Sequence, residues 1–176
     1  FAGNPYFIDY RLLASDGWLT ADEIPAERPV GPIDYGALYN ERPVVLKKAA
    51  DRLLASPSSA YEAFCREHSF WLEDYALFCA LSERYGKRFF LWPSALRQRE
   101  PSALKRAAVQ MERRVLYHKM LQYFLDHQWR ALRAYANARG VYLIGDLPIY
   151  VAPCSADVWA APALFMLSPS GAPSRL

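Results

Sequence analysis

Cysteine and histidine are both scarce in this sequence, with three of each among 176 residues. The cysteines, Cys65, Cys79 and Cys154, are odd in number and far apart. This excludes a regular disulfide framework and favours reduced thiols in a cytoplasmic protein. The histidines show no metal-ligand spacing with one another or with the cysteines, so we expect no metal site.

Long apolar runs and a strong charge imbalance are also lacking. A membrane helix needs about 18 or more consecutive apolar residues, and no such run occurs. The net charge is only +3, so we expect no nucleic-acid partner and no membrane insertion. One basic cluster alternates with acidic residues on an expected helix, which indicates a solvated face. It comprises Arg97, Arg99, Lys105, Arg106, Arg113 and Arg114.

The sequence does contain helical periodicity, after an irregular beginning. Proline and glycine interrupt residues 1–45, where we expect one short helix near Asp9–Ala14 and a turn at "VGPIDYGALY". Apolar residues recur at helical spacing from Pro43, which suits a first helical turn. After the break at "SPSS", Ser58 or Ser59 is expected to cap the next helix.

Two further helices are predicted with clearer signals. In "FWLEDYALFCALSERYG" the aromatic and apolar residues recur along one face, and Gly86 fits a C-terminal cap. A second helical pattern runs from about Ser102 to Arg139, in one or two pieces. Because its apolar stripe is wide and continues through Trp129 and Leu132, we expect this helix to be well buried.

A short apolar run, "VYLIG", follows the long helix and ends at Asp146. Such a run after a helix and a glycine fits a parallel strand covered on both faces, so we predict a strand over 141–146. Ligands collect at the carboxyl ends of strands in α/β folds. Position alone leaves Asp146 as a catalytic acid, a ligand-shaping residue or a turn-stabilising one.

Five stretches together resemble one known family. They are "FAGNPYFID", "IDYGALY", "WLEDYALFCAL", "FLDHQWRALRAYANARGVYLIGD" and "GDLPIYVAPCSADVWAAP", in that order across nearly the whole chain. The sequence is similar to the 4-α-glucanotransferases, also called amylomaltases or disproportionating enzymes. The resemblance implies the α/β class, as part of a (β/α)8 TIM barrel with a mostly helical inserted subdomain. This chain would itself be helix-rich, with about one barrel strand.

The resemblance also implies an activity. Members of the family transfer an α-1,4-glucan segment to the 4-hydroxyl of another sugar through a covalent glycosyl-enzyme, by a retaining two-carboxylate mechanism. They need no organic cofactor, and the expected partner is an α-1,4-glucan or a maltooligosaccharide. In the family both catalytic carboxylates lie after the segment that matches "SADVW". We therefore expect this chain to be an internal fragment with no catalytic residue, inactive alone.

The resemblance points to a set of substrate-binding residues. By position, Asp146 resembles an acid that shapes the donor subsite, although a structural turn role stays open and the nucleophile role is disfavoured. Tyr39 resembles an aromatic used in a second, surface glucan site, or else is an ordinary surface tyrosine. The loop matching the active site contributes Pro148, Tyr150, Asp157 and Trp159.

Two positions qualify this picture. Asn4 lies in the "AGNP" segment, where a structural turn is as plausible as a sugar contact. Cys154 stands where many members of the family have an aspartate, and a neutral thiol cannot make the hydrogen bonds of a carboxylate to a sugar.

Three regions are expected: an irregular segment at 1–45, a helical insertion at 46–103, and 104–176 with the long helix, the third barrel strand and the active-site loop. Two other functions stay open beside transfer. One is a non-catalytic glucan-binding module that uses the aromatic residues. The other is an α-glucan hydrolase of the same clan, which would differ in how well water is kept from the covalent intermediate.

Overall fold

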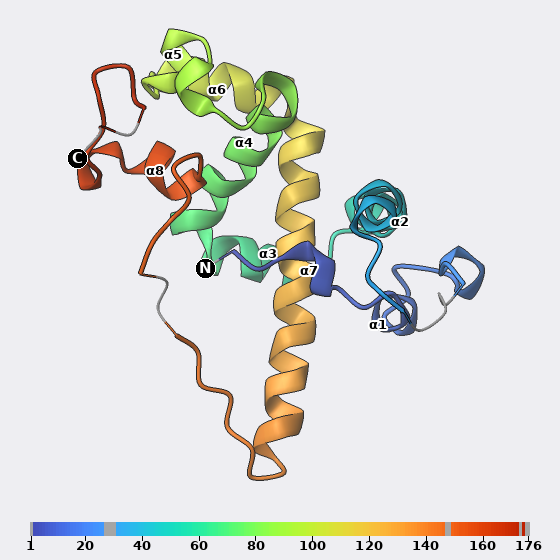
Figure 1. Cartoon of the computed structure of the whole chain (residues 1–176). Coiled ribbons are helices and arrows are strands. Elements are labelled where there is room, and N and C mark those ends of the chain that lie inside the picture. Colours follow the sequence, from blue (N-terminus) through green and yellow to red (C-terminus); the bar gives the residue numbers. More distant parts are fainter. Residues whose placement is uncertain (1, 27–30, 147–148, 173, 175–176) are drawn as a thin grey trace. The chain divides into compact units, whose positions relative to one another are not determined.

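The computed structural model describes residues 2–26, 31–146, 149–172 and 174. Contacts divide the chain into two compact units, Phe1–Glu67 with Lys119–Leu143, and His68–His118 with Ile144–Leu176. The described elements are all helical (Figure 1). They are η1 Pro5–Phe7, α1 Tyr10–Ser15, η2 Ala21–Glu23, α2 Tyr35–Ala55, α3 Ser59–Glu67, α4 Ser69–Tyr85, η3 Phe89–Leu91, α5 Ser94–Arg97, α6 Pro101–Gln110, α7 Glu112–Asn137, α8 Ala156–Ala160 and η4 Pro162–Leu164.

In the first unit, two buried glutamines of α7 hold the N-terminal segment against the helix. The Gln122 amide accepts from the Gly3 N–H at 2.8 Å and donates to the Gly3 carbonyl at 3.0 Å. The Gln128 amide pairs in the same way with the backbone of Asp9, at 2.8 and 2.9 Å. Each side chain thus satisfies a backbone donor and a backbone acceptor, as a neighbouring strand would.

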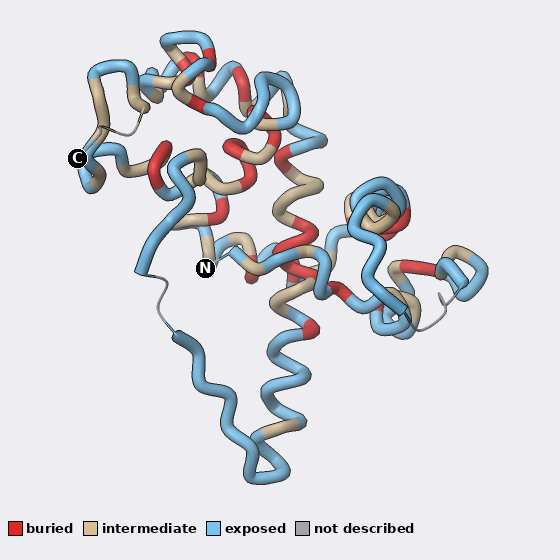
Figure 2. The backbone as a smooth tube through the Cα atoms, viewed as in Figure 1, coloured by how far each residue is buried: buried red, intermediate tan, exposed pale blue. Residues whose placement is uncertain are grey.

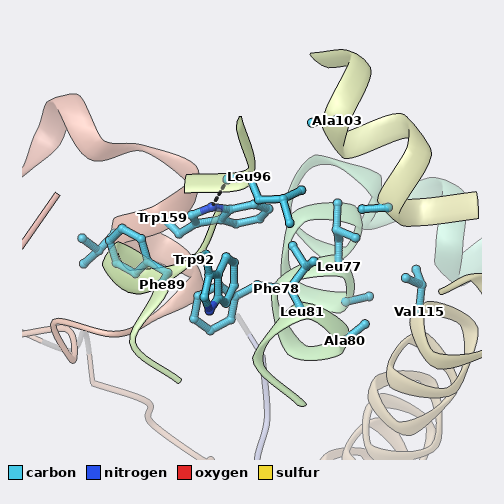
Figure 3. Packing of buried hydrophobic residues seen from close by; sticks show 13 residues of the cluster. Leu77, Phe78, Ala80, Leu81, Phe89, Trp92, Leu96, Ala103, Val115 and Trp159 are labelled. Atoms are coloured by element: carbon cyan, nitrogen blue, oxygen red, sulfur yellow. Dashed lines mark hydrogen bonds between the residues drawn. The ribbon is translucent and has the colours of Figure 1, made fainter. Parts of the chain in front are cut away.

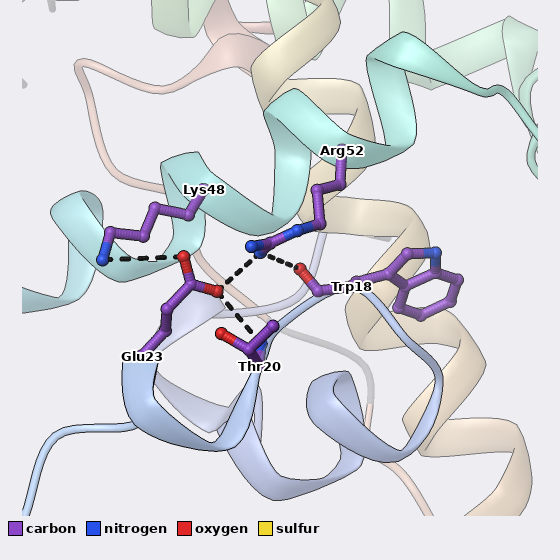
Figure 4. A network of polar contacts seen from close by, with 5 residues as sticks. All are labelled: Trp18, Thr20, Glu23, Lys48 and Arg52. Atoms are coloured by element: carbon purple, nitrogen blue, oxygen red, sulfur yellow. Dashed lines mark hydrogen bonds and ion pairs between the residues drawn. The ribbon is translucent and has the colours of Figure 1, made fainter.

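An aromatic contact and an ion-pair network complete this unit. The Trp18 ring packs on Tyr123 and Phe124 of α7, with centroids 5.7 and 4.8 Å apart. Arg52 of α2 donates to the Trp18 carbonyl at 3.0 Å and to the Glu23 carboxylate at 2.6 Å (Figure 4). The hydrogen bond from Arg52 is the main cause that lowers the pKa of Glu23, to about 2. The network therefore ties the η2 turn to α2.

The core of the second unit is built around aromatic rings from three segments (Figure 3). Trp159 of α8 meets Phe78 of α4 and Trp92, with ring centroids 5.8 and 5.7 Å apart. Aliphatic residues of α4, α5 and α6 fill the space around the rings. Buried residues occupy most of one side of α4, and the single turn of α8 packs against that side.

Several local predictions are confirmed by the structure. The short helix predicted near Asp9–Ala14 forms as α1, one residue later, and Asp9 caps it by accepting from the Arg11 and Leu12 backbone N–H groups. Ser58, rather than Ser59, caps α3 through a 3.1 Å bond from the Tyr61 N–H. Gly86 ends α4 with φ +85°, a left-handed backbone that glycine adopts without steric cost.

The start of α2 differs from the prediction. The helix begins at Tyr35, not at Pro43, so residues 35–39 of the segment predicted to turn belong to the helix. Asp34 caps it by accepting from the Ala37 N–H at 2.9 Å. Pro43 therefore lies inside the helix, where it lacks the N–H that would bond to the Tyr39 carbonyl. The helix nevertheless continues through Pro43 to Ala55.

The long helical pattern forms two helices, α6 and α7, and only part of the second is buried. Residues from Met120 to Phe124 are buried, whereas Trp129, Leu132 and Tyr135 are 47, 53 and 59% exposed (Figure 2). The prediction of a well-buried helix is wrong for this second half. The apolar stripe is present, but the described residues do not cover it beyond Gln128.

No strand is assigned within the described residues, including 141–146. The prediction of a strand there is not realised, because a strand needs a hydrogen-bonded neighbour. Val141 to Ile144 are instead exposed, with Ile144 at 95% (Figure 2). The helix-rich character is as predicted. None of the helices in the described part of the chain is both long and apolar enough to cross a membrane.

Candidate functional site

The segment that ends in α8 is the centre of the candidate site. Ser155 caps α8 by accepting from the Val158 N–H at 3.3 Å. Residues two apart on a helix point in different directions, and the structure shows the consequence. Asp157 is exposed, whereas Trp159 is buried with 1% of its surface accessible.

Trp159 is held by contacts on every side of its ring. Its indole Nε1 donates to the Leu96 carbonyl at 3.0 Å (Figure 3). The Arg99 guanidinium carbon lies 4.3 Å from the ring centroid, a cation–π distance. In this arrangement the indole faces are covered by protein, so Trp159 fixes α8 in place instead of offering a ring to a ligand.

The other predicted residues of this loop precede α8. Asp146 and Tyr150 are exposed, Tyr150 by 89%. Pro148 lies outside the described residues. The exposed Asp157 carboxylate and Tyr150 ring thus offer a hydrogen-bond acceptor and an apolar face, the two features that recognise a sugar.

Tyr39 belongs to the other unit. Its side chain is 68% exposed on α2, and Tyr35 one turn earlier is equally exposed. Residues four apart share one face of a helix, so the two rings lie on the same exposed face of α2. Asn4, also in that unit, caps η1 by accepting from the Tyr6 N–H at 3.0 Å, which is the structural turn role.

Arg99 and Asp74 are residues for which the sequence predicted no place in the site. The basic cluster was expected on a solvated face, but for Arg99 this is wrong, since its side chain is 21% exposed and donates to Asp74 at 2.7 Å. Arg99 also has φ 57°, the only positive value at a residue other than glycine in the described part of the chain. Neither feature has a signal in composition or spacing.

Other polar clusters of the second unit lie apart from these residues. Glu83 of α4 accepts from Arg114 at 2.6 Å and from His118 at 3.0 Å. Burial raises the pKa of Cys79 to about 11, so its thiol is protonated at neutral pH. Within the described residues, no group of three or more histidine, cysteine or acidic side chains is placed to hold a metal.

A groove of about 220 Å³ lies between α4, α5 and α6 and contains none of the predicted site residues. Its walls are mainly apolar, with Arg84, Arg106 and Gln110 as polar members. The candidate site is therefore the exposed loop before and within α8, with the Tyr39 face as a separate surface.

Comparison with known proteins places these features in context. A sequence profile described as 4-alpha-glucanotransferase matches residues 1–174. The chain is 42% identical to a 4-alpha-glucanotransferase from Thermus thermophilus, over 99% of this chain and 35% of that protein. It is 35% identical to a chloroplastic/amyloplastic 4-alpha-glucanotransferase from Solanum tuberosum, over 97% of this chain and 31% of that protein.

A solved structure gives the same result. An amylomaltase from Streptococcus agalactiae in complex with acarbose matches with a TM-score of 0.89 and 34% identity, over 97% of this chain and 36% of that one. The chain thus spans about a third of the length of the relatives that it matches.

Proposed function

Because the chain belongs to the 4-alpha-glucanotransferase family, whose profile matches residues 1–174, we propose that its protein transfers α-1,4-glucan segments between sugars. The donor is an α-1,4-glucan or a maltooligosaccharide, and the acceptor is the 4-hydroxyl of glucose or of another glucan. The reaction is retaining: one carboxylate attacks the sugar and forms the covalent glycosyl-enzyme, while a second carboxylic acid protonates the glycosidic oxygen that leaves and then takes the proton of the acceptor hydroxyl. No residue of this chain is assigned to that pair.

The role proposed for this chain is substrate binding. Asp157 and Tyr150 bind the glucan directly, and Pro148 and Asp146 shape the loop beside it. Exposure of Asp146, Tyr150 and Asp157 supports this assignment, because a ligand can reach them. Tyr39 forms a second glucan contact on α2, supported by its 68% exposure and by the adjacent Tyr35 ring.

The fold proposed for the whole protein is a (β/α)8 barrel in which 141–146 is the third strand. Val141 to Ile144 are apolar and exposed in this chain, as expected for a strand whose neighbours come from the two thirds of the relatives that the chain does not span. The regions 1–45, 46–103 and 104–176 would be the active-site flank, the helical insertion and the barrel portion. A cytoplasmic location fits the three free cysteines.

The acarbose complex of the similar amylomaltase supports an α-glucan substrate. The decisive experiment incubates the protein, with all sequence that its gene encodes, with maltotriose and ¹³C-labelled glucose. Transfer gives glucose together with maltotetraose and longer products, and the label appears in oligosaccharides. The peptide 1–176 alone, as a control, is expected to be inactive.

The two other functions give different results in the same assay. A hydrolase yields glucose and maltose with no longer products and no incorporated label. A binding module leaves maltotriose unchanged but still retains amylose on a column. Either outcome would replace the proposed transfer.

The surface site is tested separately. Tyr39→Ala should remove the contribution of one stacked ring, about 1 kcal/mol, and so weaken binding to amylose about five- to tenfold. Maltotriose turnover should stay unchanged. Tyr35→Ala is the matched control, because that ring lies on the same helix and is equally exposed. Equal losses in the two variants would assign binding to the pair, and no loss in either would remove the surface site.

A further inference from the structure

We propose that Arg99 is a positioning residue that fastens α8, and with it the loop carrying Tyr150 and Asp157, to α4. The feature is a contact of three segments: Asp74 on α4, Arg99 in the turn between α5 and α6, and Trp159 on α8. The consequence for glucan binding rests on the proposed function, whereas the role of Arg99 in fastening α8 to α4 is independent of it.

The backbone at Arg99 indicates that its side chain is required there. After α5, the Glu100 N–H bonds back to the Ala95 carbonyl at 2.8 Å, which closes a tight turn before α6 begins at Pro101. Arg99 occupies the left-handed position of this turn, with φ 57°. Glycine would adopt this conformation at less cost than a residue with a Cβ. An arginine at this position therefore points to a function of its side chain.

The side chain makes two contacts with different elements. Its Nη2 donates to the Asp74 carboxylate at 2.7 Å, and its Cζ atom lies 4.3 Å from the Trp159 ring centroid. Both contacts use the planar, always charged guanidinium, which lysine does not reproduce. The Nη1 atom is buried and has no hydrogen-bond partner among the described residues. The position of the guanidinium thus allows the contacts with Asp74 and Trp159 while Nη1 is left without an acceptor.

α8 depends on such contacts because it is a single turn. A helix of five residues is not stable by itself, so its packing decides its orientation. Its buried residues are Val158 and Trp159, and Trp159 receives both the hydrogen bond to Leu96 and the Arg99 guanidinium. Since Asp157 precedes both on the same helical turn, the orientation of the Asp157 carboxylate follows from how Trp159 is held.

The first experiment measures the loop directly. Cys154 immediately precedes the Ser155 cap, so its alkylation by iodoacetamide reports opening of this segment. Cys65, on α3 of the other unit, is the internal reference, and Cys79 with its raised pKa of about 11 stays slow at pH 7.5. Rates at each cysteine are read by mass spectrometry in the protein as its gene encodes it.

Five variants separate the contributions. Arg99→Ala and Arg99→Gly both remove the side chain, so both should raise Cys154 labelling by about tenfold. Only glycine also removes the backbone strain at the positive φ, so the comparison separates the side chain from the backbone. Arg99→Lys keeps the positive charge without the planar guanidinium, and Asp74→Asn keeps the contact with Trp159 but removes the ion pair, so each should raise Cys154 labelling by about threefold. Arg88→Ala, at an exposed arginine before η3, is the control and should change nothing.

The outcomes are decisive in each direction. Labelling that stays within twofold of the parent in both Arg99→Ala and Arg99→Gly overturns the proposal. A parallel rise at Cys65 also overturns it, because general destabilisation would then be the cause. The proposal is supported if the labelling rate rises at Cys154 but not at Cys65, and if the rate in Arg99→Lys lies between those of the parent and Arg99→Ala.

The second experiment tests the link to the glucan. If the parent transfers maltotriose, Arg99→Ala should raise KM by about five- to tenfold and change kcat by less than twofold, because the reacting carboxylates are not altered. An unchanged KM with faster Cys154 labelling would overturn the role in glucan binding. A parent without transfer activity would refute the proposed function alone, since the labelling result stands without turnover.

Discussion

The two glutamine bridges of α7 give the sharpest prediction about stability. Replacing Gln122 or Gln128 by methionine keeps the side-chain length and leaves one backbone N–H and one carbonyl without their partner. An unsatisfied buried group costs about 1–3 kcal/mol, and much less where water can replace the partner. Gly3 is half-buried and Asp9 is exposed. We therefore expect about 2–3 kcal/mol for Gln122→Met and about 1 kcal/mol for Gln128→Met.

The assay combines urea unfolding with amide hydrogen exchange. The Gly3 N–H should lose protection in Gln122→Met and the Asp9 N–H in Gln128→Met, each without the other, because each glutamine accepts from one of them. Gln110→Met is the control, at an exposed glutamine on α6 in the other unit. If both α7 variants match this control in stability and leave both amides protected, the bridges do not hold the N-terminal segment.

Three further predictions concern packing and protonation. Gly3→Ala should destabilise by about 1 kcal/mol, because an added Cβ would lie 2.1 Å from Leu125 Cδ2 and the leucine side chain must move; the same change should cost less in a Leu125→Ala background, and an equal cost in both backgrounds would contradict this contact. Cys79, with a pKa of about 11, should have roughly one thiolate in a thousand at pH 8, so its alkylation rate should still be rising at pH 10, and a plateau below pH 9 would show the thiol to be ordinary. For Glu83, burial raises the pKa, but hydrogen bonds from His118 and Arg114 outweigh it and the net pKa lies below 4.5. The ionised Glu83 carboxylate thus stabilises the fold above pH 4.5, and this contribution is lost as the pH falls through the lower folded pKa. An acid-unfolding midpoint that Glu83→Gln does not change would refute this.

Local signals were enough to predict helix ends. Asp9, Ser58 and Gly86 act on backbone groups within a few residues of themselves, so their effect is the same whatever the rest of the fold does. The start of α2 was missed for a related reason. Pro43 is a strong local signal for a helix start, and Asp34 is another, and the pattern alone does not say which one prevails.

The burial of α7 could not be predicted in the same way. Periodicity shows which face of a helix is apolar, but it carries no information about what covers that face. Leu121 is buried and Leu132 is exposed although both belong to one stripe. The same limit applies to Val141–Ile144, whose apolar character predicts a covered strand while the described residues leave it exposed.

For the candidate site, resemblance predicted which loop to consider but not the direction of each side chain. Asp157 and Trp159 are two residues apart on one helical turn, so they cannot both face the same ligand while α8 stays packed. Trp159 lies against Phe78, Trp92 and the Arg99 guanidinium. A glucan that contacts Asp157 therefore meets a carboxylate whose position depends on a buried indole. The turn that places Arg99 over this indole has a backbone conformation that no sequence pattern predicts for an arginine, and this is why the contact becomes visible only in the folded chain.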